Sequence, residues 1–293
     1  MRAQLGEIDI EYEVFGPEQG EPVVLMAGIF QQLTFWPRSF VDRLTGAGLR
    51  VILHDNRDIG LSTREVRPPP DLRKVNAGDL SGVNYTLSDM ASDTVGLINH
   101  LGFDSTHIVG HSMGGMIAQR IAIEFPDRVR SLVLFATKPL HEETGRSSPR
   151  FVVNLTRPPA TTRDERWEIA LEGYRICIAP ESIDEAELLA YFRSQVERAP
   201  NPKMQCLAAI GASTVMGMAA RPTHVEELGT LRIPTLVVHG AGDLVFAVDG
   251  GERLAELIPG ARLLRIENMG HFPLAAKRWG IVADAIIRHV CSR

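Results

Sequence analysis

One hydroxyl group in this chain stands among an unusual number of small residues, in the segment GHSMGG at residues 110–115. An apolar run typical of a strand precedes the segment, and a helix-like pattern follows it. In that context G-x-S-x-G is typical of a nucleophile elbow, a tight turn that lifts a serine clear of a sheet. The serine must then hold a strained backbone conformation, and its neighbours must be very small. We therefore predict that Ser112 is a nucleophile.

A serine hydroxyl is a poor nucleophile without a base, and the base needs a carboxylate that orients it. Of the nine histidines, His271 lies on a glycine-flanked loop directly after the last expected strand. Asp243 directly follows the expected strand 235–240, whereas Asp249 lies beside glycines that begin a helix and could cap it. We predict the triad Ser112, Asp243 and His271, with Asp249 as the alternative acid.

An oxyanion hole needs two backbone donors, and Met113, directly after the serine, supplies one. The loop after the expected strand 22–28 supplies the other, with Ile29 as first choice and Gly28 as second. Four residues near these loops are expected to contact substrate: Gly28, Phe30, Trp36 and His111.

The remaining histidines have weaker context. His54, His107 and His239 lie in expected strands and are interpreted as buried, hydrogen-bonded core groups or as supports of the site. No supporting context singles out His100, His141, His224 or His289.

Continuous runs rich in Val, Ile and Leu predict strands that are buried on both faces, as in a parallel sheet. They cover residues 22–28, 50–55, 107–110, 131–137, 235–240 and 262–268, after an alternating strand or hairpin arm at 8–14. Helical patterns separate them, at 39–48, 86–102, 115–125, 250–258 and 281–290. This alternation predicts an α/β fold with a mostly parallel, doubly wound sheet.

The alternation breaks between residues 138 and 230, where no strand pattern occurs. We predict a core formed by 1–137 and 231–293, with 138–230 as a mostly helical lid inserted after the sixth strand. Insertions at the carboxyl end of a sheet commonly shape a binding site. Apolar side chains of the lid could line such a pocket, although most are expected to pack inside it: Phe151, Trp167, Tyr174, Phe192, Met204, Met216 and Met218.

Composition excludes several classes of function. The 293 residues are 44% hydrophobic and 23% charged, with a net charge of −5 and no dense basic run, which argues against nucleic-acid binding. There is no apolar run of membrane-spanning length and no signal-peptide core. Three dispersed cysteines match no zinc spacing, and no phosphate-binding glycine motif occurs. We expect a cytoplasmic monomer or homodimer without metal, cofactor or membrane partner.

With these motifs in place, the chain resembles the α/β-hydrolase superfamily outside the lid, through GHSMGG, HGAGD, NMGH and DNRDIGLS. The last is similar to a family turn, and we interpret it as a tight turn with internal hydrogen bonds rather than an anion site. Family members usually carry His-Gly before the oxyanion donor, whereas this chain has Ala27-Gly28. Two longer stretches, at 26–63 and 85–102, resemble the aclacinomycin methylesterase group, mainly in the first half of the chain.

The resemblance and the triad together imply a serine esterase that acts on a small or medium apolar ester. Lactones and thioesters are possible substrates, and the same triad serves cofactor-free perhydrolysis and C–C bond hydrolysis in other proteins of this fold. A non-catalytic ligand-binding protein is the alternative from a different class. A serine at the elbow argues against the dehalogenases and epoxide hydrolases of this fold, which use aspartate there.

Overall fold

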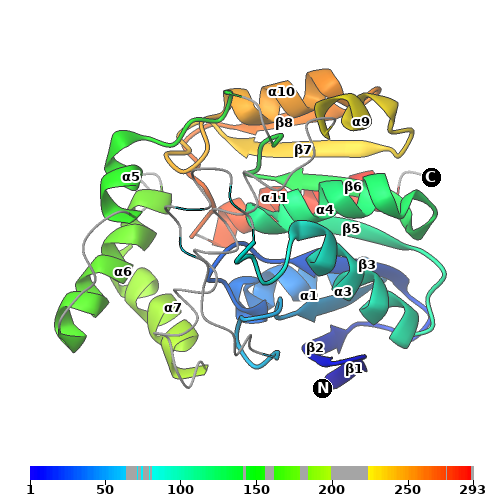
Figure 1. The fold of residues 1–293 in the computed structure, drawn as a ribbon, viewed down its shortest axis with the longest axis horizontal. Coiled ribbons are helices and arrows are strands. Elements are labelled where there is room, and N and C mark those ends of the chain that lie inside the picture. Colours follow the sequence, from blue (N-terminus) through cyan, green and yellow to red (C-terminus); the bar gives the residue numbers. More distant parts are fainter. Residues whose placement is uncertain are drawn as a thin grey trace.

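The chain folds around one eight-stranded sheet with the strand order β1-β2-β4-β3-β5-β6-β7-β8. A computed structural model describes residues 1–63, 71, 74, 79, 81–140, 143–155, 162–178, 184–198, 224–274 and 276–291. β1 and β2 form an antiparallel hairpin, and β2 is antiparallel to β4, while all later pairings are parallel. The predicted mostly parallel α/β sheet is therefore confirmed (Figure 1).

The strands agree with the apolar runs of the sequence to within a few residues, and only β1 lies outside the expected set. They are β1 (Arg2–Leu5), β2 (Ile8–Phe15), β3 (Glu21–Met26), β4 (Leu49–His54), β5 (Thr106–His111), β6 (Val129–Phe135), β7 (Thr235–Gly240) and β8 (Arg262–Ile266). All six residues of β5 and of β7 are buried, as expected for strands covered on both faces.

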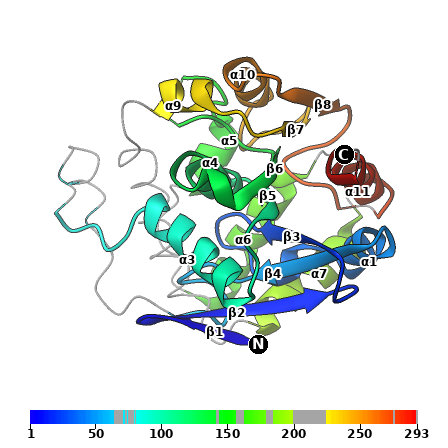
Figure 2. The same cartoon turned by 90° about the vertical axis from the view of Figure 1, so that its right-hand side faces the viewer.

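Helices cover both faces of the sheet (Figure 2). One face carries α3 (Leu87–His100), α4 (Met113–Glu124) and α9 (His224–Thr230), with α10 (Asp249–Leu257) over β7 and β8; the other carries α1 (Arg38–Gly46) and α11 (Ala276–Cys291). Two 3₁₀ turns complete this part, η1 (Leu33–Phe35) and η2 (Pro126–Arg128). The start of α3 is fixed by a reciprocal capping box between Thr86 and Asp89.

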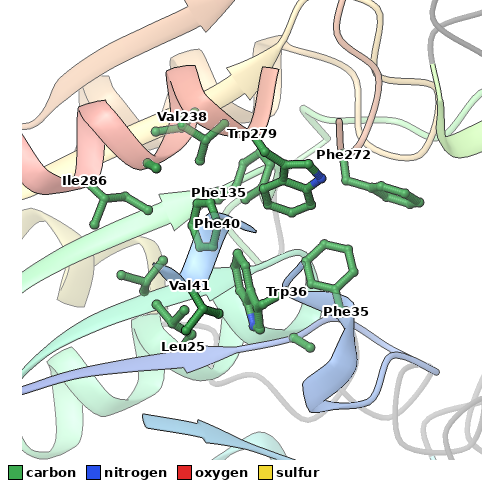
Figure 3. Close-up of a cluster of buried hydrophobic side chains, with 14 of the residues drawn as sticks. Leu25, Phe35, Trp36, Phe40, Val41, Phe135, Val238, Phe272, Trp279 and Ile286 are labelled. Carbon is green, nitrogen blue, oxygen red and sulfur yellow. The ribbon is translucent and has the colours of Figure 1, made fainter. Parts of the chain in front are cut away.

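Each face of the sheet has its own apolar core. The core on the α1 and α11 side is rich in aromatic rings, which stack and cross edge to face around Trp36 (Figure 3). Trp36 lies against Phe40 of α1 and Trp279 of α11 and is only 3% exposed. Aromatic pairs of this kind add stability beyond the area that they bury.

Helices α5 (Pro149–Leu155), α6 (Arg163–Cys177) and α7 (Glu185–Arg198) follow β6 and lie to one side of the sheet (Figure 1). Arg198, at the end of α7, donates from Nη1 to Asp55 Oδ2 at 2.7 Å and to Gln32 Oε1 at 2.8 Å. Asp55 also accepts the backbone N–H groups of Leu33 and Leu61. These bonds join α7 to the loops after β3 and β4.

The turn expected at DNRDIGLS is confirmed. Its backbone bonds run from Ile59 N to Asn56 O and from Ser62 N to Ile59 O, and the Ser62 hydroxyl donates to Asp55 O at 2.6 Å. Arg57 points away from this cluster and pairs with Asp93 on α3. Asp55 and Arg57 are thus used in structural contacts.

The chain reverses direction across the sheet between β3 and β5, which are paired neighbours with Met26 opposite Gly110. β4 lies on the far side of β3, whereas β6, β7 and β8 follow one another beyond β5. In open α/β sheets the crevice at such a switch point, beyond the carboxyl ends of the strands, is the usual ligand site. The GHSMGG segment leaves β5 at this crevice.

Close packing at the switch point requires glycine in the first turn of α4. A Cβ atom on Gly114 would lie 2.4 Å from Met26 O at the end of β3, and one on Gly110 would lie 2.2 Å from Gly114 O. Both contacts are with backbone atoms, which cannot rotate away. The approach of α4 to β3 and β5 therefore depends on the absence of these side chains.

We expect Gly114→Ala to lower the free energy of unfolding by about 1–3 kcal/mol or to prevent folding, because the new methyl group must push α4 away from β3. Gly46→Ala, at the end of α1, is the matched control: its Cβ would meet nothing within 4 Å. That control should change stability by less than about 1 kcal/mol. Urea unfolding measures both, and equal midpoints for Gly114→Ala and wild type would contradict the packing argument.

Candidate active site

Ser112 follows β5 directly, with the unusual backbone angles φ 55° and ψ −118°. Its N–H donates to Phe135 O on β6 at 2.9 Å, and its carbonyl accepts Gly115 N at 2.9 Å. Positive φ is costly for a residue with a side chain and persists only where the surroundings enforce it. These bonds and the glycine contacts supply that enforcement, so the serine stands on a strained elbow.

The N-terminus of α4 lies directly behind the serine, because Met113 is the first residue of that helix. The first four N–H groups of a helix have no partner within it, and they carry its positive dipole end. The Met113 N–H is therefore suited to hold developing negative charge. Whether it does so in catalysis stays a prediction.

The loop after β3 closes in a turn in which Gln31 N donates to Gly28 O at 3.3 Å. Phe30 has φ 62° in this turn. Gly28 lies directly against the nucleophile elbow, since a Cβ there would be 3.0 Å from Ser112 Cβ. The loop expected to carry the second oxyanion donor thus lies beside the serine.

Asp243 and His271 form a buried pair, with His271 Nδ1 2.8 Å from Asp243 Oδ2. The other carboxylate oxygen, Oδ1, accepts the backbone N–H groups of Val245 at 2.8 Å and Phe246 at 2.9 Å. Burial alone would raise the pKa of Asp243, but the His271 ring and a hydrogen bond from His239 outweigh it and hold that pKa well below its usual range. Asp243 is therefore ionised at neutral pH.

Asp249, the alternative acid, is engaged elsewhere. It is the first residue of α10, makes no side-chain cap, and accepts Gly145 N through Oδ1 at 2.9 Å. The geometry thus favours Asp243 over Asp249 as the partner of the histidine.

The backbone of His271 is bonded on both sides. Its N–H donates to the carbonyl of Cys177, the last residue of α6, at 2.7 Å. Its own carbonyl lies 3.0 Å from Nε2 of His111, and the two imidazole rings are 4.8 Å apart between centroids. Because His111 directly precedes Ser112, this contact brings the histidine loop to the elbow.

Gln31 supports the loop after β3, in which Ala27 stands where family members usually carry histidine. Its Oε1 accepts Gly28 N at 2.7 Å and lies 3.0 Å from His111 Nδ1. The N–H of Gly28 is therefore already used, which favours Ile29 over Gly28 as the oxyanion donor of this loop. Sequence reasoning missed Gln31, although the missing His-Gly pair signalled that another side chain had to brace the loop.

His111 connects these two loops and is wholly buried. Burial lowers the pKa of its imidazole well below the usual value, and the nearby His271 lowers it further. The ring is therefore neutral and has one N–H, which it donates either to Gln31 or to the His271 carbonyl. Its ring packs on Phe35 at 4.5 Å between centroids. The expected substrate contact at His111 is replaced by this bracing role.

Trp36 is a second correction among the expected substrate contacts. Its indole lies in the core between the sheet and helices α1 and α11, against Phe40 and Trp279 (Figure 3). The run of aromatic residues after β3 reflects this packing. Phe30 remains only partly buried in the turn, and its contact with substrate stays a prediction.

Aromatic side chains of α6 and α7 approach the histidine loop. Tyr174 and Tyr191 each lie 6.2 Å between ring centroids from Phe272, the residue after His271. Trp167 and Phe192 pack edge to face at 4.5 Å, inside the helical segment. The expected lining residues Met204, Met216 and Met218 lie outside the described residues, as do His141 and Cys206.

Within the described part of the chain, no cluster of three or more His, Cys, Asp and Glu side chains could hold a metal ion. In the same residues, no helix has the length and apolarity needed to cross a bilayer.

Comparison with known proteins gives a family match at residues 21–167, described as the alpha/beta hydrolase fold. The chain belongs to this family. The match begins at β3 and includes the elbow and the first helices after β6.

Individual relatives cover almost the whole chain. It is 28% identical to rhodomycin D methylesterase DauP of a Streptomyces species, in an alignment of 310 positions that covers 97% of this chain and 95% of that protein. The resemblance to methylesterases of this type is therefore confirmed and extends well beyond the first half of the chain.

Two solved structures have the same fold. A thermophilic esterase from Thermogutta terrifontis is 27% identical with a TM-score of 0.73, covering 100% of this chain and 98% of that one. The meta-cleavage product hydrolase CumD from Pseudomonas fluorescens is 20% identical with a TM-score of 0.78, covering 100% and 97%.

We expect Gln31→Leu to slow the labelling of Ser112 by a fluorophosphonate by about tenfold. The Gly28 N–H loses its acceptor, Gln31 Oε1, and the loop after β3 is then held less firmly beside the serine. Gln4→Leu makes the same chemical change on the exposed face of β1 and should react at the wild-type rate. Mass spectrometry of the labelled serine over time measures both rates. Wild-type reactivity of Gln31→Leu would contradict the bracing role.

Proposed function

We propose that the protein is a hydrolase of carboxylic esters that uses Ser112 as its nucleophile and forms an acyl-enzyme. One observation carries the proposal: a buried Asp243–His271 pair with a 2.8 Å hydrogen bond lies on a loop that contacts His111, the neighbour of a serine on a strained elbow. The strained backbone of Ser112 costs free energy, and such strain typically occurs at active sites, where it exposes a nucleophile.

In the proposed mechanism His271 acts as the base. Asp243 holds Nδ1 of the imidazole, which leaves Nε2 as the nitrogen that takes the proton from Ser112 Oγ. The oxygen attacks the ester carbonyl, and the resulting oxyanion is held by the N–H groups of Met113 and Ile29. Loss of one such donor typically costs about 10²–10³ in rate.

The imidazolium of His271 then gives its proton to the leaving alcohol, and the same ring later activates the water that hydrolyses the acyl-enzyme. The Asp243 carboxylate supports both steps because its low pKa keeps it ionised beside the positive ring. Both side chains are buried, which strengthens this charge interaction over its value in water.

A small or medium apolar ester is the proposed substrate. The aromatic rings of α6 and α7 near Phe272 support an apolar acyl or alcohol group. Similarity to a rhodomycin D methylesterase and to a thermophilic esterase supports the ester bond as the one that is cleaved.

We expect the purified protein to hydrolyse p-nitrophenyl esters of short or medium chain length, and Ser112→Ala to abolish the activity. Asp243→Asn should reduce kcat by about 10³–10⁴, since it removes the carboxylate that fixes the tautomer of His271. Asp249→Asn is the matched control and should retain the wild-type rate, because its Oδ1 contact can be kept by an amide oxygen.

Absence of turnover on the whole panel, together with failure of a fluorophosphonate to label Ser112, would contradict the proposed function. Wild-type activity of Asp243→Asn would contradict the acid assignment. An assay with hydrogen peroxide and a carboxylate in place of the ester separates esterase from perhydrolase activity. Perhydrolysis faster than hydrolysis would replace the proposed reaction.

A further inference from the structure

His239 lies at the end of β7, two strands away from the nucleophile, and is wholly buried. Its Nε2 is 3.2 Å from Asp243 Oδ2 and 2.9 Å from the backbone O of Phe246. Both neighbours are acceptors, because Asp243 is ionised and a carbonyl carries no proton. Nε2 of His239 must therefore carry a proton.

The other ring nitrogen has the opposite surroundings. Nδ1 of His239 has no hydrogen-bond partner among the described residues. It faces α10, where a Cβ on Gly251 would lie 2.4 Å from it. A proton on this nitrogen would be buried without an acceptor, which is costly. The contacts thus select a neutral ring with its single N–H on Nε2.

With this tautomer, Asp243 accepts three N–H groups, and the N–H of His239, which bonds the Phe246 carbonyl, lies next to it as a fourth. The backbone N–H groups of Val245 and Phe246 bond to Oδ1 and the His271 ring bonds to Oδ2, while Nε2 of His239 lies 3.2 Å from Oδ2. The carboxylate cannot turn without breaking several bonds at once. His239 also bonds the carbonyl of Phe246, whose ring lies 5.6 Å from that of His271 between centroids.

We infer that His239 is a positioning residue for the catalytic acid: as a neutral Nε2–H tautomer it holds the backbone of Phe246, which bonds Asp243 Oδ1, and places its N–H against Oδ2, so that Asp243 aligns His271 with Ser112. This inference rests on the proposed hydrolase function, and it adds a second histidine that acts through the acid and touches no substrate. The N–H dipole of His239 also stabilises the negative charge of Asp243 while His271 is protonated.

Two amide substitutions separate the role of the donor from that of the ring. Glutamine can place an N–H near the position of His239 Nε2, whereas the amide of asparagine falls near Nδ1, where no acceptor lies. We expect His239→Asn to lower kcat for ester hydrolysis by about ten- to a hundredfold with KM changed by less than about twofold. His239→Gln should recover kcat to within about threefold of wild type.

Circular dichroism and thermal unfolding establish that both variants are folded. A wild-type kcat in folded His239→Asn would overturn the inference, as would a His239→Gln protein no faster than His239→Asn. A fall confined to KM would also overturn it, since alignment of the acid acts on the chemical step and not on binding.

Nitrogen NMR of the wild-type protein with isotope-labelled histidine tests the same geometry without any variant. The expected spectrum has a neutral His239 ring with a protonated Nε2 and a bare Nδ1. A proton on Nδ1, or an imidazolium, would overturn the inference. If the wild type hydrolyses no ester, the proposed function fails, and the NMR result still decides the tautomer and contacts of His239.

Discussion

The backbone of Ser112 is the constraint on which the surrounding structure depends. A serine with φ 55° needs a rigid frame, and that frame consists of the paired strands β3, β5 and β6 and the close approach of α4. The same approach brings the helix N-terminus, the loop after β3 and the serine to one point. The strain at Ser112 and the position of the α4 N-terminus beside it thus follow from a single packing arrangement at the switch point.

Loops from four strands meet at this point, and polar contacts join them. Gln31 bonds the N–H of Gly28 within its own loop, His111 lies between Gln31 and the His271 carbonyl and donates its one N–H to one of them, and Asp243 binds the ring of His271. Charge is concentrated on one group of this network. Asp243 stays ionised, whereas burial keeps His111 neutral. Of these two neighbours of His271, only the Asp243 carboxylate therefore carries a charge.

Most of the sheet and the contact between Asp243 and His271 could be predicted from the sequence, because both depend on local pattern. Buried parallel strands are continuous apolar runs, and side chains directly after them meet at one edge. β1 was missed because its four residues show no clear pattern. Gln31 and the Cys177 contact were missed because they join residues brought together only by tertiary structure. Trp36 was misjudged because an aromatic residue beside a site and one in the core look alike in sequence.

The hydrogen bond from His271 N to the Cys177 carbonyl joins the histidine loop to the end of α6, within the helical segment that follows β6. The helical segment and the proposed base, His271, are therefore joined by a backbone hydrogen bond. A displacement of α6 would be transmitted through this bond to the backbone that carries the His271 imidazole. Transplanting the helical segment from a relative would, by the same bond, replace part of the catalytic frame, and its junction at Cys177 would need to be preserved.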